Sequence, residues 1–253
     1  METNTVHAIY FSPAMSTKKV VRAVASGISE QVVNYDITQG WKKEPVFSKN
    51  DIAVIGVPSY SGRVPKLASQ YLSELSANNI PAIIICVYGN RAYEDTLIEL
   101  KNICSESGFS VIGAGAFIAR HSIFPNVAEG RPDPTDIEAA RNFGQECLKK
   151  TEGGILHLTG NFPYREINSV PLVPKGDWHC DKCGICIKGC PTGAIDIYNP
   201  KKTDKNKCIS CARCIEFCPV GSRKFKGVLY RVAKSQFTKN YNSRKENELF
   251  FLQ

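Results

Sequence analysis

Eight of the eleven cysteines of this chain form two runs with the same spacing. The first run is Cys180, Cys183, Cys186 and Cys190, and the second is Cys208, Cys211, Cys214 and Cys218. A proline follows each run directly, at Pro191 and at Pro219. The pattern Cys-x2-Cys-x2-Cys-x3-Cys-Pro is a bacterial spacing for the thiolate ligands of [4Fe–4S] clusters. The sequence therefore predicts two such clusters.

The ligands of the two clusters are expected to be interleaved. Where a chain carries two runs of this kind, the fourth cysteine of each run ligates the cluster of the other run. One cluster would then use Cys180, Cys183, Cys186 and Cys218, and the other would use Cys208, Cys211, Cys214 and Cys190. Structural zinc sites use two ligand pairs with a longer gap, and a disulfide framework needs an oxidising compartment. Both alternatives fit the spacing less well.

Length and composition indicate a globular protein with room for more than the cysteine runs. The chain has 253 residues, of which 43% are hydrophobic, enough for a domain with a core and a smaller module. Residues 1–7 show no signal peptide, and the longest apolar run, residues 80–87, is too short to span a bilayer. We therefore expect a cytoplasmic protein without a membrane span. Cys86, Cys104 and Cys147 lie in apolar segments and are expected to be buried thiols.

The formal net charge of +8 is concentrated near the C-terminus. Residues 222–253 hold eight Lys and Arg and two Asp and Glu, a net charge of +6. This basic C-terminal tail is either a solvated segment that packs partly on another domain, or a docking surface for an acidic redox partner. No motif supports nucleic-acid binding. A homodimer is also compatible with the sequence.

Residues 1–150 alternate apolar runs with amphipathic segments. Strands are expected at residues 6–11, 32–37, 52–57, 82–87 and 111–119, and helices at residues 18–29, 67–75, 97–104 and 135–150. Thr135 and Glu138 are expected to form a capping box at the start of the last helix. Strands that are apolar on both faces and separated by helices predict a parallel sheet covered on both sides. Five strands suit a doubly wound sheet of order 2-1-3-4-5.

The remainder of the chain is divided by its glycines, prolines and cysteines. Residues 151–176 are rich in Gly and Pro and are expected to form a linker with one short strand at residues 155–158. The cysteine runs define a small α+β domain at residues 177–221. The basic tail, residues 222–253, follows it.

Three loops of the first domain are expected to form a binding site, because open parallel sheets bind ligands at the carboxyl ends of their strands. The candidate residues are Ser12, Ala14, Met15, Ser16 and Thr17 in the first loop, Pro58, Ser59, Tyr60, Ser61, Gly62 and Arg63 in the second, and Tyr88, Gly89, Asn90 and Tyr93 in the third. The first loop places hydroxyl groups at a helix N-terminus, which favours an anion. The chain lacks the Gly-x-Gly-x-x-Gly and Gly-Lys-Ser/Thr motifs of dinucleotide and P-loop sites.

With these loops and cysteine runs the chain resembles the flavodoxin–ferredoxin fusion proteins of anaerobic bacteria and archaea, over about residues 5–220. Residues 11–17 are similar to the loop that binds the FMN phosphate in flavodoxins. Residues 56–65 and 87–93 are similar to the loops that flank its isoalloxazine ring. The resemblance implies a flavodoxin-like, doubly wound parallel five-stranded sheet that binds FMN, followed by a bacterial-type ferredoxin domain.

One feature of the first loop departs from that family. Flavodoxin loops usually carry Thr-Gly where this chain has Ala14-Met15, so we expect weakened FMN binding. Arg63 and Arg91 could stabilise a reduced flavin or be solvated. His121 could be a proton donor or a hydrogen-bonded structural residue.

The resemblance implies an electron-transfer protein. Electrons would pass between two [4Fe–4S] clusters and FMN and on to redox partner proteins. Two alternatives stay open: a flavin-dependent reductase of a small molecule that is fed by its clusters, and a non-catalytic docking subunit of a larger redox complex. The sequence therefore leaves an electron carrier and an oxidoreductase side by side, and it names no catalytic residue.

Overall fold

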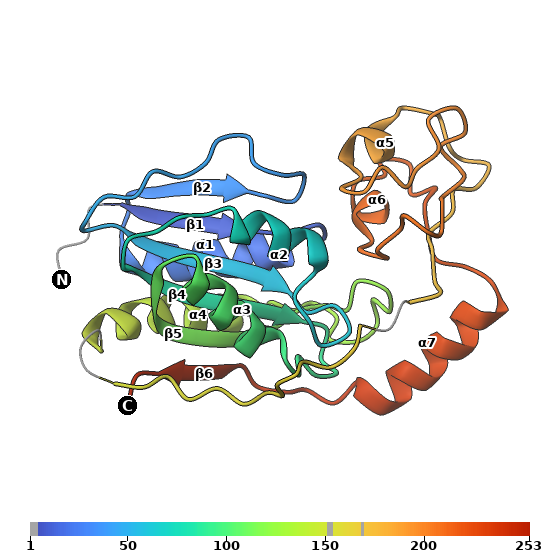
Figure 1. Cartoon of the computed structure of the whole chain (residues 1–253). Helices are drawn as coiled ribbons and strands as arrows, with labels where there is room; N and C mark the ends of the chain where they lie inside the picture. The colour runs from blue at the N-terminus through green and yellow to red at the C-terminus, as the bar shows by residue number, and fades with distance from the viewer. Residues whose placement is uncertain (1–4, 151–153, 168–169) are drawn as a thin grey trace.

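The first domain is an open parallel sheet with helices on both faces (Figure 1). The structure is a computed structural model that describes residues 5–150, 154–167 and 170–253. The parallel strands are β1 (Val6–Tyr10), β2 (Val32–Asp36), β3 (Ile52–Pro58), β4 (Ile80–Tyr88) and β5 (Phe109–Ile118). Their order β2-β1-β3-β4-β5 is that of a flavodoxin-like sheet, as predicted.

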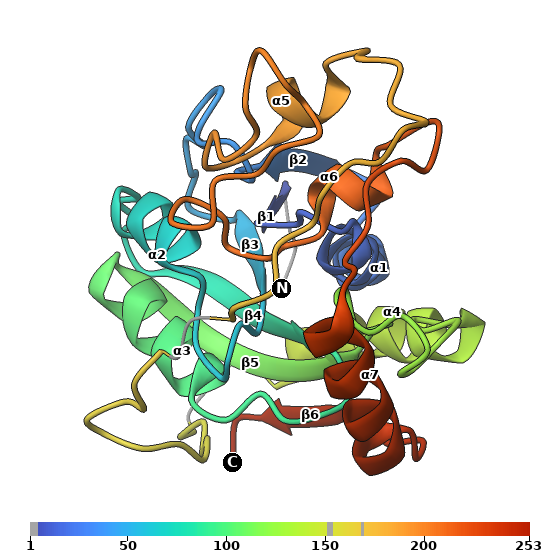
Figure 2. The same ribbon diagram turned by 90° about the vertical axis from the view of Figure 1, so that its right-hand side faces the viewer.

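Four helices cover the two faces of this sheet. They are α1 (Ser16–Ile28), α2 (Lys66–Ser73), α3 (Thr96–Glu106) and α4 (Pro134–Lys149). Figure 2 shows α1 and α4 on one face and α2 and α3 on the other. Successive side chains of β4 therefore enter different cores: Ile83 and Ile85 pack on the α1/α4 side, and Ile84 packs on the α2/α3 side.

Helix α1 lies very close to the sheet. A Cβ atom added to Gly56 of β3 would lie 2.2 Å from Cγ2 of Val21 on α1. A glycine at this point lets the helix approach, which brings the N-terminus of α1 to the carboxyl edge of the strands.

The capping box at the start of α4 is formed by other residues than the sequence predicted. The Asp133 side chain accepts from the Asp136 N–H at 3.0 Å, and Asp136 accepts from the Asp133 N–H at 2.8 Å. Pro134 is the first helical residue, a position where a missing N–H costs nothing, so Asp133 is the cap. The prediction of Thr135 and Glu138 was therefore wrong by two residues.

The sheet has a sixth strand that the sequence reading missed. Strand β6 (Glu248–Phe251) pairs antiparallel with β5, with Gly113 opposite Phe251. It follows helix α7 (Val228–Tyr241), which packs through its Phe237 on His121 and Phe124 of the first domain. The basic tail thus returns to the first domain and adds to its sheet.

The cysteine-rich domain is small and contains two short helices, α5 (Ile185–Gly189) and α6 (Arg213–Glu216), which pack together. Its first and last segments meet at a β-bridge between Lys175 and Lys224. Figure 1 shows it beside the edge of the sheet toward which the parallel strands point.

The segment before the cysteine-rich domain lies along the first domain. The strand expected at residues 155–158 is not formed; instead Ile155 and Gln253 exchange two backbone hydrogen bonds, of 2.9 and 3.4 Å. The Asp95 carboxylate accepts from the N–H groups of Asn161 at 2.8 Å and Arg165 at 2.7 Å. These bonds hold the segment in place.

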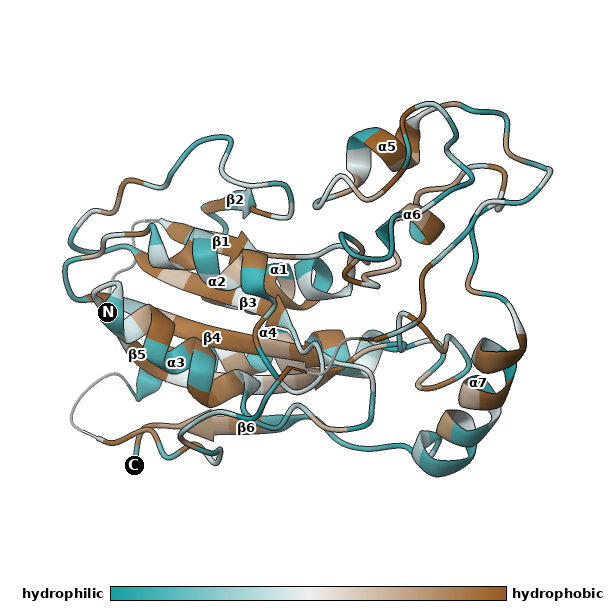
Figure 3. Cartoon of the chain, turned by 45° about the vertical axis from the view of Figure 1, so that its right-hand side comes forward, coloured by the Kyte–Doolittle hydropathy of each residue, from teal (hydrophilic) through white to brown (hydrophobic). Residues whose placement is uncertain are grey.

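Apolar residues are concentrated in the strands of the sheet, as the hydropathy colours of Figure 3 show. Cys86, Cys104 and Cys147 are buried, which confirms that expectation. Burial raises the pKa of the Cys104 and Cys147 thiols to about 12. In the part of the chain that the structure describes, no helix combines the length and apolarity needed to cross a membrane.

The packing of β6 generates a stability prediction. Phe251 contacts the ring of Phe143 (centroids 5.3 Å apart), and Lys150 Nζ lies 4.5 Å from its centroid. We expect Phe251→Ala to lower the free energy of unfolding by about 2–3 kcal/mol, because it leaves a cavity beside α4. Denaturant unfolding followed by circular dichroism measures this. Phe162→Ala is the control: Phe162 is 86% exposed. Equal loss in the two variants would contradict the packing of β6.

Candidate functional site

A cavity of about 360 Å³ lies at the carboxyl ends of the parallel strands. The three predicted loops line it, together with residues 119–124, which follow β5, and with Ile209 and Ser210 of the cysteine-rich domain. The volume falls within the usual range for small-molecule and cofactor sites. The cavity therefore lies between the sheet and the domain that carries the cysteines.

Most of the predicted loop residues line this cavity. They are Ala14, Ser16, Thr17, Pro58, Ser59, Tyr60, Ser61, Gly62, Tyr88 and Gly89. Arg91 and His121, which the sequence reading considered singly, line it as well. The residues it missed include Arg120, Ser122, Ile123 and Phe124. They follow the end of β5, so the rule that identified the other loops applies to them too.

Four predicted residues do not line the cavity because other groups hold their side chains. Arg63 forms an ion pair with Glu99 through bonds of 2.7 and 2.8 Å. Asn90 is buried and donates to the carbonyl groups of residues 241 and 243 at 2.6 and 2.8 Å, and Tyr93 donates to Glu248 at 2.8 Å. Ser12 is buried, and its hydroxyl accepts from the N–H of residue 18 at 2.9 Å. These side chains therefore form structural bonds, within the first domain or to the C-terminal segment, and do not face the cavity.

Met15 also lies outside this cavity. It has a φ of 66°, in the left-handed region, and is the N-cap of α1. It lines a neighbouring cavity between α1 and the cysteine-rich domain. Glycine adopts such a φ without the steric cost that a side chain brings, about 1–2 kcal/mol. The backbone there suits the glycine of flavodoxin loops, although this chain has methionine.

The first turn of α1 gives the cavity an anion-binding wall. Ser16 and Thr17 belong to that turn and line the cavity. The turn contains no acidic residue, and the helix dipole and free N–H groups of a helix N-terminus favour a negative charge. Arg165 also lines the cavity; its guanidinium pairs with Glu94, and its buried Nε has no hydrogen-bond partner among the described residues. A bound group with a phosphate and polar ring atoms would fit this set of donors.

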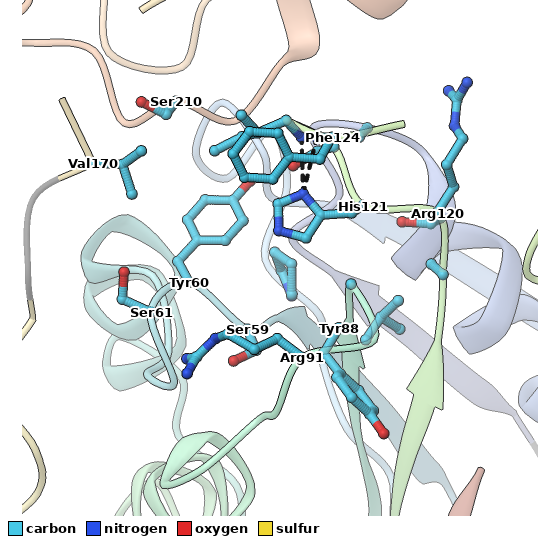
Figure 4. Close-up of a pocket in the computed structure, with 18 of the residues that line it drawn as sticks. Ser59, Tyr60, Ser61, Tyr88, Arg91, Arg120, His121, Phe124, Val170 and Ser210 are labelled. Atoms are coloured by element: carbon cyan, nitrogen blue, oxygen red, sulfur yellow. Dashed lines mark hydrogen bonds between the residues drawn. The ribbon is translucent and has the colours of Figure 1, made fainter. Parts of the chain in front are cut away.

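His121 is held as a neutral ring on the cavity wall (Figure 4). Its Nδ1 accepts from the N–H groups of Ile123 at 3.2 Å and Phe124 at 3.1 Å, so the proton is on Nε2. Burial lowers the pKa of His121 to about 4, and the positive charge of Arg91 acts in the same direction. His121 therefore has a structural role, and its Nε2–H group is a neutral donor.

Tyr60 lies between the cavity and the cysteines. Figure 4 shows its ring reaching toward Phe124, away from Ser61 and Arg91. Burial raises the pKa of the Tyr60 hydroxyl well above 10, and the nearby thiols of Cys211 and Cys208 raise it further. Tyr60 therefore lines the cavity and is also close enough to the second cysteine run to feel the charge of its thiols.

Four thiols from both cysteine runs surround a second, small cavity: Cys190, Cys208, Cys211 and Cys214. Burial raises the pKa of Cys211 to about 12, and the charges of the other three thiols act in the same direction. The N–H of Ala194 donates to Sγ of Cys190 at 3.3 Å, and that of Ser210 donates to Sγ of Cys208 at 3.4 Å. A cavity that is ringed by four thiols and receives N–H donors fits a cluster with negatively charged sulfur ligands.

The other cysteines lie around α5. The pKa of Cys186 is raised mainly by burial, and the charges of Cys180 and Cys183 raise it further. Cys218 follows α6, which packs against α5. Among the described residues, no three His, Cys, Asp or Glu side chains are close enough to share a single metal ion.

Comparison with known proteins agrees with the cysteine pattern. Residues 168–222 match the family model described as a 4Fe-4S dicluster domain. A stretch of 63 residues, 25% of this chain, is 36% identical to an epoxyqueuosine reductase of Francisella cf. novicida (strain Fx1). That stretch spans 17% of the reductase.

The structure is similar to those of several flavodoxins. Flavodoxin 1 of Bacillus cereus is 17% identical, with a TM-score of 0.45, over 58% of this chain and 98% of that protein. For a flavodoxin of Streptococcus pneumonia TIGR4 the identity is 14% and the TM-score 0.43, over 58% and 99%. The rubredoxin oxygen:oxidoreductase of Desulfovibrio gigas is 16% identical with a TM-score of 0.42, over 58% of this chain and 36% of that one.

The strand order and the cysteine pattern together define the class of this protein. The first domain has the flavodoxin-like sheet, shown by its own topology. The domain that follows is a 4Fe-4S dicluster domain. The chain thus joins a flavodoxin-like domain to a ferredoxin-type iron–sulfur domain, a combination suited to electron transfer.

The environment of His121 generates a prediction on pH. Its pKa of about 4 is below the ordinary value of 6.5, so between these values the unfolded chain binds a proton that the folded protein does not. The stabilisation is present above pH 6.5 and is lost as the pH falls toward 4. We expect His121→Asn to show a shallower loss of unfolding free energy across this window, measured by denaturant titration at each pH. Equal slopes in the two proteins would contradict the low pKa.

Proposed function

We propose that this protein transfers electrons between FMN, bound in the cavity of the first domain, and two [4Fe–4S] clusters. The observation that supports this most directly is that Ile209 lines both the large cavity and the cavity of the four thiols. Ile209 lies between Cys208 and Cys211 in the sequence. A flavin in one cavity and a cluster in the other would be separated by little more than one side chain and the Tyr60 ring.

The walls of the large cavity suggest how this chain holds FMN. The first turn of α1, with Ser16 and Thr17, would receive the phosphate. The loops after β3 and β4 would flank the ring system, with Tyr60 on the side of the cysteines. Bound FMN would supply two-electron chemistry, whereas each cluster carries one electron.

The positions of the two cysteine sets support different roles for the two proposed clusters. We term the set Cys190, Cys208, Cys211 and Cys214 the proximal set, and the set Cys180, Cys183, Cys186 and Cys218 the distal set. Ile209 and Ser210, which lie between two cysteines of the proximal set, line the large cavity, and Cys211 is buried. In the distal set Cys183 is exposed. A partner protein would exchange electrons at the distal cluster, and the proximal cluster would connect it to FMN.

Transfer within one molecule is the test of this function. Anaerobic protein loaded with FMN is given electrons at its clusters by a one-electron reductant, and the flavin absorbance is followed at several protein concentrations. We expect a rate that does not depend on concentration. We expect Cys190→Ala to abolish this transfer, because it removes a proximal ligand. Cys218→Ala is the matched substitution in the distal set, and it should leave the proximal cluster in place.

The spectra of these two variants also test the ligand sets. Iron content and electron paramagnetic resonance should show that each variant keeps the cluster of the other set. Loss of the opposite cluster would reject the interleaved assignment. A rate that rises with concentration would mean that electrons pass between molecules. Turnover of small acceptors without a protein partner would favour the reductase alternative.

The first loop generates a separate prediction on flavin affinity. Ala14 lines the large cavity, and Ala14→Thr should add one hydroxyl donor to the phosphate. A hydrogen bond to a charged group is worth about 1.5–3 kcal/mol, so we expect FMN to bind at least roughly tenfold more tightly. Titration followed by the quenching of flavin fluorescence measures this.

Met15→Gly is the control for that prediction. Its side chain lies in the neighbouring cavity, so the substitution should raise the free energy of unfolding by about 1 kcal/mol through relief of the left-handed backbone. FMN affinity should change much less than in Ala14→Thr. Absence of FMN binding in native protein and in both variants would contradict the flavin part of the proposed function.

A further inference from the structure

Arg223 is a buried arginine at the centre of the cysteine-rich domain. Its residue exposure is 2%. The guanidinium donates to the carbonyl groups of Pro174 at 2.9 Å and of Pro200, and to the Thr203 hydroxyl at 2.5 Å. Its Nε is buried and has no hydrogen-bond partner within residues 5–150, 154–167 and 170–253. The side chain is therefore fixed in position, with part of its donor capacity unused.

The same guanidinium lies next to thiols of both cysteine sets. Its partner Pro174 lines the cavity of the four thiols. Burial raises the pKa of the proximal thiols Cys214 and Cys208, and the charge of Arg223 opposes that rise. Burial also raises the pKa of Cys186 in the distal set, and the charge of Arg223 again opposes the rise. Cys186 is on α5 and Cys214 is on α6, and the two helices pack together. One buried cation thus lies where the two sets meet.

The charge of Arg223 has no counter-ion among the side chains that the structure describes. In the described part of the chain, no carboxylate lies within ion-pair distance of it; its oxygen partners are two carbonyl groups and a hydroxyl. An arginine does not lose its proton in a protein, and an unpaired buried charge is strongly unfavourable. Clusters with thiolate ligands would supply the missing negative charge, and an electron added to either one increases it.

We propose that Arg223 sets the reduction potentials of both clusters by stabilising their reduced, more negatively charged forms. A cation held close to a cluster in a medium of low dielectric constant favours the added electron, and net charge and hydrogen bonds to sulfur are known to control such potentials. Because Arg223 adjoins both sets, it raises the two potentials together, which keeps the pair matched for transfer from one cluster to the other. This inference rests on the cluster part of the proposed function and not on FMN.

The test uses anaerobic protein with both clusters, titrated with reductant while electron paramagnetic resonance follows each cluster. We expect Arg223→Gln to shift both midpoint potentials to more negative values. Arg223→Lys keeps the charge and should leave both close to native. The control is Lys224→Gln, which removes the same charge from the next residue. Lys224 bonds Asp177 at 2.7 Å and its side chain is 50% exposed, so both potentials should change little.

The outcomes distinguish an effect of Arg223 on the reduction potentials from a purely structural role in the domain. Native potentials in Arg223→Gln, or an equal negative shift in Arg223→Lys, would overturn the proposal. If Arg223→Gln assembles no clusters while Arg223→Lys has both at native potentials, the charge is what the clusters require, which supports the proposal. If neither variant assembles clusters, Arg223 is a structural support and the proposal is overturned. Iron content of the native protein tests the clusters separately, so failure of the proposed function is distinguishable.

Discussion

The pairing of β6 with β5 determines where the iron–sulfur domain lies. The chain leaves the first domain after α4, forms the cysteine-rich domain, and must return through α7 to place β6 on the sheet edge. Both segments that flank the cysteine-rich domain are therefore anchored, one by the bonds to Asp95 and the other by the bonds of Asn90 to the tail. A domain on a single flexible linker would occupy many positions, whereas two anchored connections restrict it to the carboxyl edge of the strands.

Direct contacts between the domains add to this restraint and are mostly polar. Gln39 donates to the Lys188 carbonyl at 2.6 Å, Arg213 donates to the Pro13 carbonyl at 3.3 Å, and Arg120 pairs with Glu216 at 3.1 Å. Single polar contacts that are partly exposed contribute little each, so they align the domains more than they bind them. The apolar packing of α7 on His121 and Phe124 supplies the stronger part. The same packing closes the cavity wall, so the placement of the domain and the shape of the candidate site have one cause.

Local patterns in the sequence were sufficient for the parallel sheet and for most of the candidate site. Strands that are buried on both faces leave continuous apolar runs, and the carboxyl ends of such strands identify the loops. Features that depend on distant contacts were not readable in this way. Strand β6 has four residues at the end of a basic tail, and what makes it a strand is the exposed edge of β5. The proximity of Ile209 to the large cavity depends on how two domains meet. Arg223 looked like part of a basic tail, although it is buried, because charge alone does not show burial.

The difference in exposure between the two cysteine sets gives the proposed electron path a direction in space. Cys211 is buried, and it lies in the run whose Ile209 lines the large cavity, whereas Cys183 is exposed. On the proposed path, an electron that arrives at the surface would move inward, away from dissolved oxygen that could oxidise it, toward a cavity with a neutral His121 and the Tyr60 ring. Each inward step would place negative charge in a less polar environment, which is unfavourable unless a cation compensates it. The chain provides such a cation between the sets, at the buried Arg223. Arg91 and Arg165 on the cavity wall are partly exposed, and both pair with Glu94. On this argument the buried Arg223, rather than the exposed lysines of the tail, is what makes an inward path energetically possible.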